Sequence, residues 1–239
     1  MKKKMKTKDR MSGKLEKIGY DAKQYKQLKN RCKELESEVA KNYKNLQKIT
    51  EGIFNIITRI IETRDPYIEG HQGRVARLAT AVAGKMKLSK KTIDGIKFAS
   101  LIHDLGKVNL PTEIVSRPGK LFEVEFNLIK NHPNIGYEIL KKIEFPWPVA
   151  EIVLQHHEKI DGSGYPQGLK GNQILLEAKI ICVADVIESM SSTRSYRPAI
   201  KIDKCLQEII ENKNILFDPE VVDVCVTLFK EKNFTFEPV

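Results

Sequence analysis

The chain has 239 residues, 41% of them hydrophobic, and its net charge of +10 comes from the amino-terminal part. Residues 1–48 carry 16 Lys and Arg against 6 Asp and Glu, whereas the remainder is neutral, so we expect no nucleic-acid partner for the main domain. No apolar run reaches the roughly 18 residues of a membrane span, and no apolar signal core follows the lysine-rich start. The four cysteines show no CxxC pairing, which predicts a cytoplasmic protein with reduced thiols.

A heptad repeat begins at Ile18, after a basic tail at residues 1–17 that is predicted to be flexible. Its a and d positions are mostly apolar, with Asn42 as a polar exception. This pattern predicts a coiled-coil stalk over residues 18–52, and therefore a homodimer joined through the amino-terminal helix. A long amphipathic helix packed on its own domain is the alternative. Beyond Ile53 we expect the same apolar stripe to enter the domain core.

The remaining residues, 53–239, are predicted to form one domain that consists of successive helices. Apolar residues recur at spacings of three and four, and no alternating strand pattern stands out. The segments predicted as helices are 53–63, 74–86, 92–105, 123–130, 134–143, 147–157, 177–191, 202–211 and 219–229. The predicted fold class is therefore all-α, a helical bundle preceded by a long amino-terminal helix.

All five histidines of the chain lie in motif-like surroundings, accompanied by two aspartates. The seven residues are His71, His103, Asp104, His132, His156, His157 and Asp185. Imidazole and carboxylate donors together suit Zn, Fe, Mn, Co or Ni. Seven donors exceed the need of one ion, and paired ions about 3.5–4 Å apart are the usual apparatus for hydrolysing phosphate esters. Any one of these histidines alone would be explained as well by a core or surface position.

Two stretches carry most of this prediction. His103 and Asp104 close an apolar helix, where a charged aspartate is costly unless a cation pairs with it, although a helix-capping pair is the alternative. Lys107 follows one helical turn later and is placed to neutralise a phosphate, unless it is an ordinary surface lysine. The histidine pair at residues 156–157 precedes a glycine-rich loop, and such a loop permits close backbone approach to a ligand.

These motifs resemble the HD-GYP domain, a branch of the HD phosphohydrolase superfamily. The residues that carry the resemblance are His71 with Arg74-Val75-Ala76, Ile102-His103-Asp104-Leu105-Gly106-Lys107, His132, the string from His156 through Glu158, Asp161, Gly164 and Tyr165 to Pro166, and Val183-Ala184-Asp185-Val186. The similar region covers residues 53–211. The long histidine-to-proline string is far more specific than the His-Asp pair.

The resemblance implies a phosphodiesterase that hydrolyses cyclic di-GMP to pGpG and/or GMP, through a hydroxide shared by two divalent transition-metal ions. It implies that His71, His103, Asp104 and Asp185 hold one ion, and that Asp104 bridges to a second ion held by His132, His156 and His157. Iron or manganese is expected, with zinc or nickel as alternatives. Lys107 would lie beside the scissile phosphate, and Asp161, Gly164, Tyr165, Pro166, Arg194 and Arg197 would contribute to substrate binding.

Two positions depart from the family pattern. Tyr67 stands where some members place a glutamate for a third metal ion, so we expect two ions. Ser195 replaces a usual proline. Two other functions on the same scaffold remain open: a phosphohydrolase acting on another nucleotide or cyclic dinucleotide, and a di-iron oxygenase. A silent receptor domain is disfavoured because every expected ligand is present. The helical arm indicates control by an upstream sensor domain or a separate partner.

Overall fold

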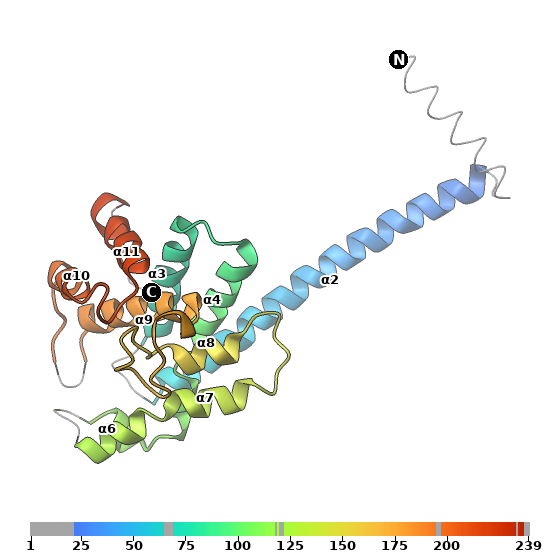
Figure 1. Cartoon of the computed structure of the whole chain (residues 1–239). Helices are drawn as coiled ribbons and strands as arrows, with labels where there is room; N and C mark the ends of the chain where they lie inside the picture. Colours follow the sequence, from blue (N-terminus) through green and yellow to red (C-terminus); the bar gives the residue numbers. More distant parts are fainter. Residues whose placement is uncertain are drawn as a thin grey trace. The chain divides into compact units, whose positions relative to one another are not determined.

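The computed structural model of the chain describes residues 22–64, 69–117, 119, 122–194, 197–232 and 234–236. All regular elements in this part of the chain are helical (Figure 1), which confirms the predicted all-α class. Within the same ranges no helix is long and apolar enough to cross a membrane. The predicted flexible tail at residues 1–17, the first four residues of the predicted stalk (18–21) and the positions Tyr67 and Ser195 lie outside the described residues.

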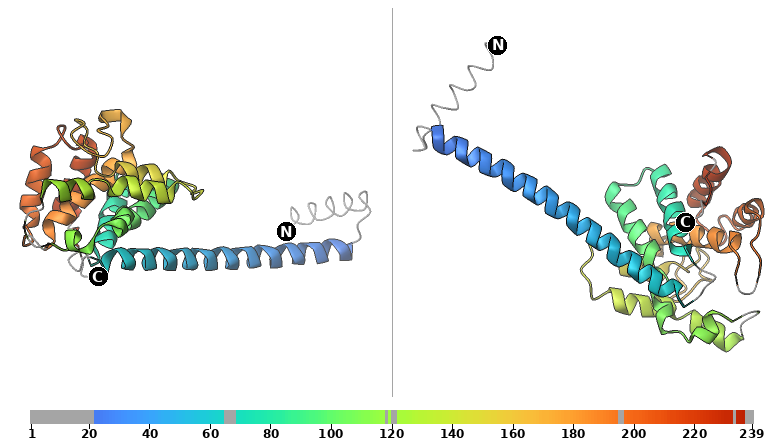
Figure 2. Two further views of the ribbon diagram at one scale, coloured as in Figure 1. Left: turned by 90° about the horizontal axis from the view of Figure 1, so that it is seen from below. Right: turned by 180° about the vertical axis from the view of Figure 1, so that it is seen from behind.

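Helix α2 (Ala22–Glu62) is the predicted long amino-terminal helix, and Figure 2 shows it as one unbroken helix. The chain separates into two compact units, Met1–Gly52 and Ile53–Val239, and the last turns of α2 belong to the second unit. Aliphatic residues of the heptad stripe are exposed along the helix: Leu28, Leu35, Val39, Leu46, Ile49, Ile53, Ile56 and Ile60.

The expectation that this stripe enters the domain core beyond Ile53 is wrong. Ile53 is 51% exposed and Ile56 is 61% exposed, whereas Phe54 and Ile61 on another face of the helix are buried. The ring of Phe54 packs on that of Phe98, with centroids 4.6 Å apart. An aromatic pair of this kind adds to the burial of apolar area. The last turns of α2 therefore contribute one face to the core and leave the heptad face uncovered.

The described part of the second unit contains eleven further helical elements that follow one another closely. They are α3 (His71–Lys85), α4 (Lys90–Ile102), the 3-10 turn η2 (Leu105–Asn109), α5 (Thr112–Val115), α6 (Glu123–Ile129), α7 (His132–Leu140), α8 (Val149–Gln155), η3 (Gly171–Gln173), α9 (Leu176–Ser191) and α10 (Ile202–Glu211), with α11 (Pro219–Lys232) after them. Helix α3 packs against α4 and α9, and α7 packs against α8 and η2 (Figure 1). These contacts bring the ends of α3, α4, α7 and α8 toward one region.

Helix α9 lies within the core of this unit. Nine of its sixteen residues are buried and seven of these are apolar, among them Ile180, Ile181 and Ile187, and a helix that is apolar on most sides is typically interior. Two carboxylates, Asp185 and Glu188, are nevertheless buried on the same helix. Buried carboxylates require paired charge or hydrogen bonds, so α9 marks where polar chemistry is held inside the fold.

Gly106 allows η2 to lie directly against the start of α7. A Cβ at this position would lie 1.9 Å from the carbonyl oxygen of His132 and 2.8 Å from the backbone nitrogen of Gly136. Both contacts are with backbone atoms, which cannot move aside as a flexible side chain can. The backbone on either side of Gly106 therefore approaches α7 more closely than any other residue would permit.

We predict that Gly106→Ala lowers the free energy of unfolding by about 1–3 kcal/mol, because overpacking forces backbone shifts. Chemical denaturation monitored by circular dichroism measures the change. Gly84→Ala in α3 is the matched control, since a Cβ there meets nothing within 4 Å. That control should stabilise the helix by about 0.5–1 kcal/mol. Equal effects of the two substitutions would contradict the close approach.

Candidate metal centre

Four of the five histidines lie at helix ends that meet in the second unit. His71 is the first residue of α3 and His132 the first residue of α7, whereas His103 and His156 follow the last residues of α4 and α8. All four side chains are at most 2% exposed. Helix ends place a side chain beside unpaired backbone groups, which then orient it.

The backbone fixes which nitrogen of three imidazoles carries the proton. Nδ1 of His103 donates to the carbonyl oxygen of Ser100 at 2.7 Å, and Nδ1 of His132 donates to that of Ile129 at 2.7 Å. Nδ1 of His156 donates in the same way to the carbonyl oxygen three residues earlier. A carbonyl oxygen only accepts, so each Nδ1 bears the hydrogen and each Nε2 offers a lone pair.

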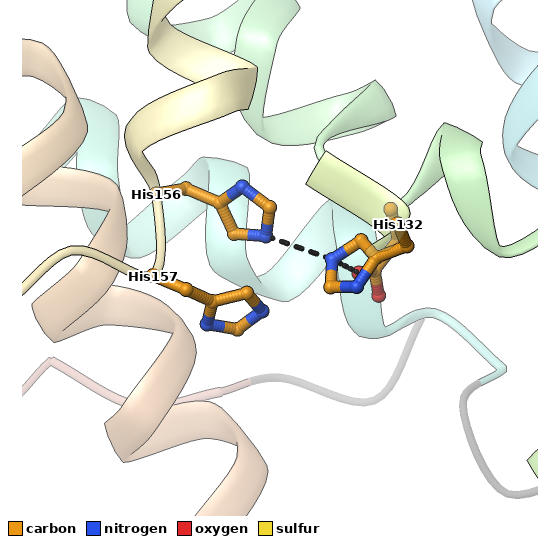
Figure 3. Close-up of side chains that lie close together, drawn as sticks. His132, His156 and His157 are labelled. Atoms are coloured by element: carbon orange, nitrogen blue, oxygen red, sulfur yellow. Dashed lines mark hydrogen bonds and ion pairs between the residues drawn. The ribbon is translucent and has the colours of Figure 1, made fainter. Parts of the chain in front are cut away.

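These lone pairs point at one another. Nε2 of His132 and Nε2 of His156 are 3.2 Å apart, and Figure 3 shows the two rings facing each other with His157 beside them. Nε2 of His132 also lies 3.3 Å from Oδ1 of Asp104. None of these three atoms has a proton to donate, so they repel one another unless a cation lies among them. Metal–nitrogen bonds of about 2.0–2.1 Å are compatible with such spacings.

Two buried atoms without a hydrogen-bond partner also indicate that a cation belongs in this cluster. Oδ1 of Asp104 and Nε2 of His103 are buried and have no hydrogen-bond partner among the described residues. Buried polar atoms are nearly always paired, and a missing ion is a standard reason for an exception. The donor set therefore fits a divalent metal ion. Asp104, His132, His156 and His157 can each offer one atom to such an ion, all within 4.8 Å of one another.

Asp104 belongs to a second group of donors on its other side. This group contains His71, His103 and Asp104, again with donor atoms within 4.8 Å of one another. Oδ1 of Asp185 lies 3.2 Å from Nε2 of His71 and 3.9 Å from Nε2 of His103, so Asp185 joins it. The structure thus brings together all seven residues that the sequence predicted as ligands, with Asp104 between the two groups.

The charges of the cluster suit a cation. Burial would raise the pKa of Asp104, but Lys107 and the neighbouring histidines hold it well below its usual range. Burial lowers the pKa of His103, and it lowers the pKa values of His156 and His157 well below their usual range. At neutral pH these three imidazoles are therefore uncharged and the Asp104 carboxylate is ionised, which are the states that bind metal.

Lys107 lies beside the shared aspartate, as the sequence predicted. Its Nζ is 2.7 Å from Oδ2 of Asp104, and the side chain is 26% exposed, so its ammonium can reach both the cluster and solvent. The short η2 turn between the two residues produces this contact. An ammonium in this position can donate to an anionic oxygen that binds next to the cluster.

Glu188 is a functional candidate that the sequence analysis missed. Its carboxylate is fully buried and accepts hydrogen bonds from Nδ1 of His71, from Arg74 at 2.7 Å and from Arg194 at 3.1 Å. Burial would raise the pKa of Glu188, but the His71 hydrogen bond and the Arg194 charge lower it to about 2. A carboxylate on Nδ1 orients a ligand histidine and increases its basicity. The spacing of Glu188 three residues after Asp185 on one helix was the available signal.

His71 differs from the other histidines because carboxylates face both of its nitrogens. Burial would lower the pKa of His71, but Asp185 and Glu188 raise it to about 9. In the absence of a cation the ring is therefore an imidazolium that neutralises two buried carboxylates. Metal binding at Nε2 displaces that proton, so a metal ion and a proton compete for the same position.

The glycine-rich loop after His157 is held by Glu158. This carboxylate is 3% exposed and accepts hydrogen bonds from the backbone nitrogens of Gln167 at 2.7 Å and Leu169 at 3.0 Å. Gly164 packs against the backbone beneath it, since a Cβ there would lie 2.3 Å from the nitrogen of Lys159. The loop is thus closed onto the residues that follow α8.

The predicted substrate residues of this loop differ in their surroundings. The ring of Tyr165 packs on that of His157, with centroids 4.7 Å apart, and the peptide bond from Tyr165 to Pro166 is cis. Asp161 is exposed and accepts from the backbone nitrogen and hydroxyl of Ser163, so its carboxylate organises a turn. Tyr165 therefore lies next to the candidate metal centre, whereas Asp161 shapes the loop.

The two arginines predicted to bind phosphate are engaged with the protein itself. Arg194 donates to Glu188 and to the hydroxyl of Ser189, and its Nη2 lies 3.2 Å from Nδ1 of His71. Arg197 donates to the carbonyl oxygens of Ser189 and Met190. Arg194 therefore lies at the Nδ1 side of the His71 ring, and Arg197 holds the end of α9.

Comparison with known proteins gives a consistent result. The HD domain family matches residues 55–221. The chain is similar to the cyclic di-GMP phosphodiesterase response regulator RpfG of Xanthomonas campestris, with 37% identity over 202 residues, covering 84% of this chain and 53% of that protein. It is similar to a cyclic di-GMP phosphodiesterase of Thermotoga maritima, with 35% identity over 208 residues, covering 86% and 56%. The chain thus spans about half the length of these relatives.

A solved structure shares the fold. The cyclic GMP-AMP-specific phosphodiesterase V-cGAP3 of Vibrio cholerae superposes with a TM-score of 0.59 at 19% identity, over 76% of this chain and 49% of that chain. At this identity the likeness concerns the fold alone, and it agrees with the helical bundle described above.

We predict that Asp104→Asn lowers the affinity for divalent metal at least about 100-fold, since losing an orienting group beyond the ligands already costs about 10–100-fold. Calorimetric titration of the chelator-treated protein with Mn²⁺ measures the affinity. Asp223→Asn is the control, because that carboxylate is 65% exposed and pairs with a surface lysine. An unchanged metal affinity in Asp104→Asn would show that the cluster is not the binding site.

Proposed function

Because the chain belongs to the HD domain family, we propose that it is a metal-dependent phosphodiesterase that hydrolyses cyclic di-GMP to pGpG and/or GMP. The observation that carries the proposal is Asp104, whose buried carboxylate lies between two groups of metal donors with the ammonium of Lys107 at 2.7 Å. The two relatives named as cyclic di-GMP phosphodiesterases support the choice of substrate.

The cofactor in this proposal is a pair of divalent transition-metal ions. His71, His103 and Asp185 would hold one ion, His132, His156 and His157 the other, and Asp104 would contribute to both. Iron or manganese suits this mixture of imidazole and carboxylate, with zinc or nickel as alternatives. When bound, two such ions lower the pKa of a water towards neutrality and polarise phosphoryl oxygens.

The chain's own residues would bind and orient the substrate. Lys107 donates to a non-bridging phosphoryl oxygen, where a preorganised positive charge acts best as negative charge develops. Glu188 accepts a hydrogen bond from Nδ1 of His71, and Arg74 donates to Glu188, so these two residues orient the His71 ring. Gly164, Tyr165 and Pro166 would line the substrate site, since the Tyr165 ring packs on His157 beside the cluster, and Asp161 maintains the shape of their loop. Arg194 and Arg197 would contribute to substrate binding indirectly, since Arg194 holds Glu188 at the Nδ1 side of His71 and Arg197 holds the end of α9.

Hydrolysis of cyclic di-GMP by protein purified anaerobically with Fe²⁺ or Mn²⁺ tests the proposal. We predict linear pGpG or GMP in the chromatogram, and a loss of kcat of about 100–1,000-fold in Lys107→Ala, the usual cost of removing one donor to the developing charge. Lys142→Ala, which alters an exposed lysine of the same domain, should retain full activity.

The absence of product from metal-loaded protein would reject the proposal. Turnover of a small organic substrate that consumes oxygen would instead favour the di-iron oxygenase. Products from another nucleotide, with none from cyclic di-GMP, would favour the second phosphohydrolase alternative. Each result is read from the same preparation with two metal ions demonstrably bound.

We further propose that residues 18–52 form a stalk that joins two copies of the chain as a parallel dimer, with residues 53–239 as the catalytic domain. The exposed heptad residues support this, since Leu46 is 62% and Ile49 is 59% exposed in the single chain. A row of uncovered aliphatic side chains in water is unfavourable, and a second copy of the same helix is its natural cover.

The end of α2 is suited to pass a signal from such a stalk to the catalytic residues. Thr58 donates to the carbonyl oxygen of Leu101 at 3.1 Å, two residues before His103. Arg64 donates to the carbonyl oxygens of Val108 and Leu110 just after Lys107. The segment that carries the His-Asp pair is therefore held on one side by Thr58 in α2 and on the other by Arg64, two residues beyond the end of α2, so a rotation of this helix would move it.

We predict that Leu46→Glu converts the full chain from dimer to monomer in analytical ultracentrifugation, because a charge at position a of each strand repels its counterpart. Lys44→Glu is the matched control, since this exposed residue lies away from the heptad seam on the same helix and should leave the dimer intact. A wild-type chain that sediments as a monomer at micromolar concentration would contradict the stalk.

A further inference from the structure

Helix α6 presents aromatic side chains and a lysine on one face, next to the candidate metal centre. Phe122, Phe126 and Lys130 recur every four residues, which places them in one row along the helix. Phe122 is 69% and Phe126 is 44% exposed. Nζ of Lys130 lies 4.8 Å from the centroid of the Phe126 ring, so the ammonium sits over an exposed aromatic surface.

This row connects with the ring that covers the cluster. Nζ of Lys130 also lies 5.9 Å from the centroid of Tyr165, and Tyr165 packs on His157 at 4.7 Å. Lys130 is two residues before His132, and the carbonyl oxygen of Ile129, the residue that precedes Lys130, orients the His132 ring. A continuous series of rings around one ammonium therefore leads outward from the donors of the cluster.

In the ranges that the structure describes, no carboxylate forms an ion pair with the ammonium of Lys130. Two aromatic faces with a half-buried ammonium between them form a surface that accepts a flat ring by stacking and donates a hydrogen bond to its edge. Among biological ligands a nucleobase has that combination of a flat face and a polar edge.

We propose that Phe126, Lys130 and Tyr165 form a guanine-binding subsite that sets the base preference of the enzyme. This rests on the proposed cyclic dinucleotide phosphodiesterase function. A lysine only donates, and guanine presents two acceptors, O6 and N7, on one edge, whereas adenine replaces O6 with an amino group that also donates. Lys130 therefore favours guanine over adenine, while Phe126 stacks on either base.

Equilibrium binding tests this subsite independently of turnover. Cyclic di-GMP and cyclic di-AMP are titrated into the Mn²⁺-loaded full chain carrying Lys107→Ala, which keeps all the metal donors and slows hydrolysis. We expect Lys130→Met, added to that background, to weaken cyclic di-GMP about tenfold, as for one charge-assisted hydrogen bond, and to change cyclic di-AMP by less than about twofold. Phe126→Ala should weaken both ligands by a similar factor of about tenfold.

Matched controls come from the same region. Val124→Ala lies on α6 away from the row and is 73% exposed, and Lys142→Met removes a lysine elsewhere on the surface. Both should leave the two affinities unchanged. An equal loss for both dinucleotides in Lys130→Met would overturn the proposal, since it would mean that the lysine binds a phosphate shared by both.

The same titration separates the subsite from the proposed function. Selective binding of cyclic di-GMP that depends on Lys130, in a chain whose wild type releases no product, would retain the subsite and reject the phosphodiesterase. Hydrolysis of cyclic di-GMP by Lys130→Met with an unaltered preference over cyclic di-AMP would reject the subsite and retain the phosphodiesterase. Absence of binding of either dinucleotide to the metal-loaded Lys107→Ala chain would overturn the subsite.

Discussion

The carboxylate of Asp104 is buried at 1% exposure, and a buried carboxylate is stable only where positive charge or hydrogen bonds surround it. Lys107 supplies one charge, at Oδ2. On the side of Oδ1 the chain offers only lone pairs, because the backbone has already taken the hydrogens of His132 and His156 at Nδ1. The arrangement of the surrounding helices is therefore suited to a cation that the polypeptide does not itself contain.

The positions of the helix ends follow from this requirement. Each histidine that donates Nδ1 to a carbonyl three residues earlier must lie where a helix ends or begins, since carbonyls inside a helix are already paired. Gly106 and Gly164 then let the adjoining segments approach the backbone of neighbouring elements without a Cβ. The His71 ring is oriented by the carboxylate of Glu188 and not by a backbone carbonyl, and the pKa of His71 is correspondingly raised.

Much of this arrangement could be predicted from the sequence. Periodicity located the longer helices from residue 53 onward to within a few residues, because most of them bury a regular apolar face, whereas the short elements η2, α5 and η3 were not predicted. The seven metal-binding candidates could be grouped because the chain has only five histidines, and because these and the two aspartates all lie in recognisable motifs. Their mutual distances, and the place of Asp104 between the two groups, depend on contacts between α3, α4, α7 and α8 that no local pattern encodes.

Other features could not be anticipated. Glu188 looks like any helical glutamate until α3 brings His71 against it. Arg194 was expected to face a phosphate, and its bonds to Glu188 depend on the turn after α9. The heptad stripe continues uncovered to Ile60 because Phe54 and Ile61 contact the core from another face, and a stripe alone does not reveal which of two faces the domain selects.

We propose that two metal ions share Asp104. A crystal structure of the Mn²⁺-loaded protein, with anomalous scattering recorded at the manganese edge, tests it most directly. We expect two anomalous peaks, one beside His71, His103 and Asp185 and one beside His132, His156 and His157, each within bonding distance of an oxygen of Asp104. A single peak, or peaks that do not contact Asp104, would contradict it.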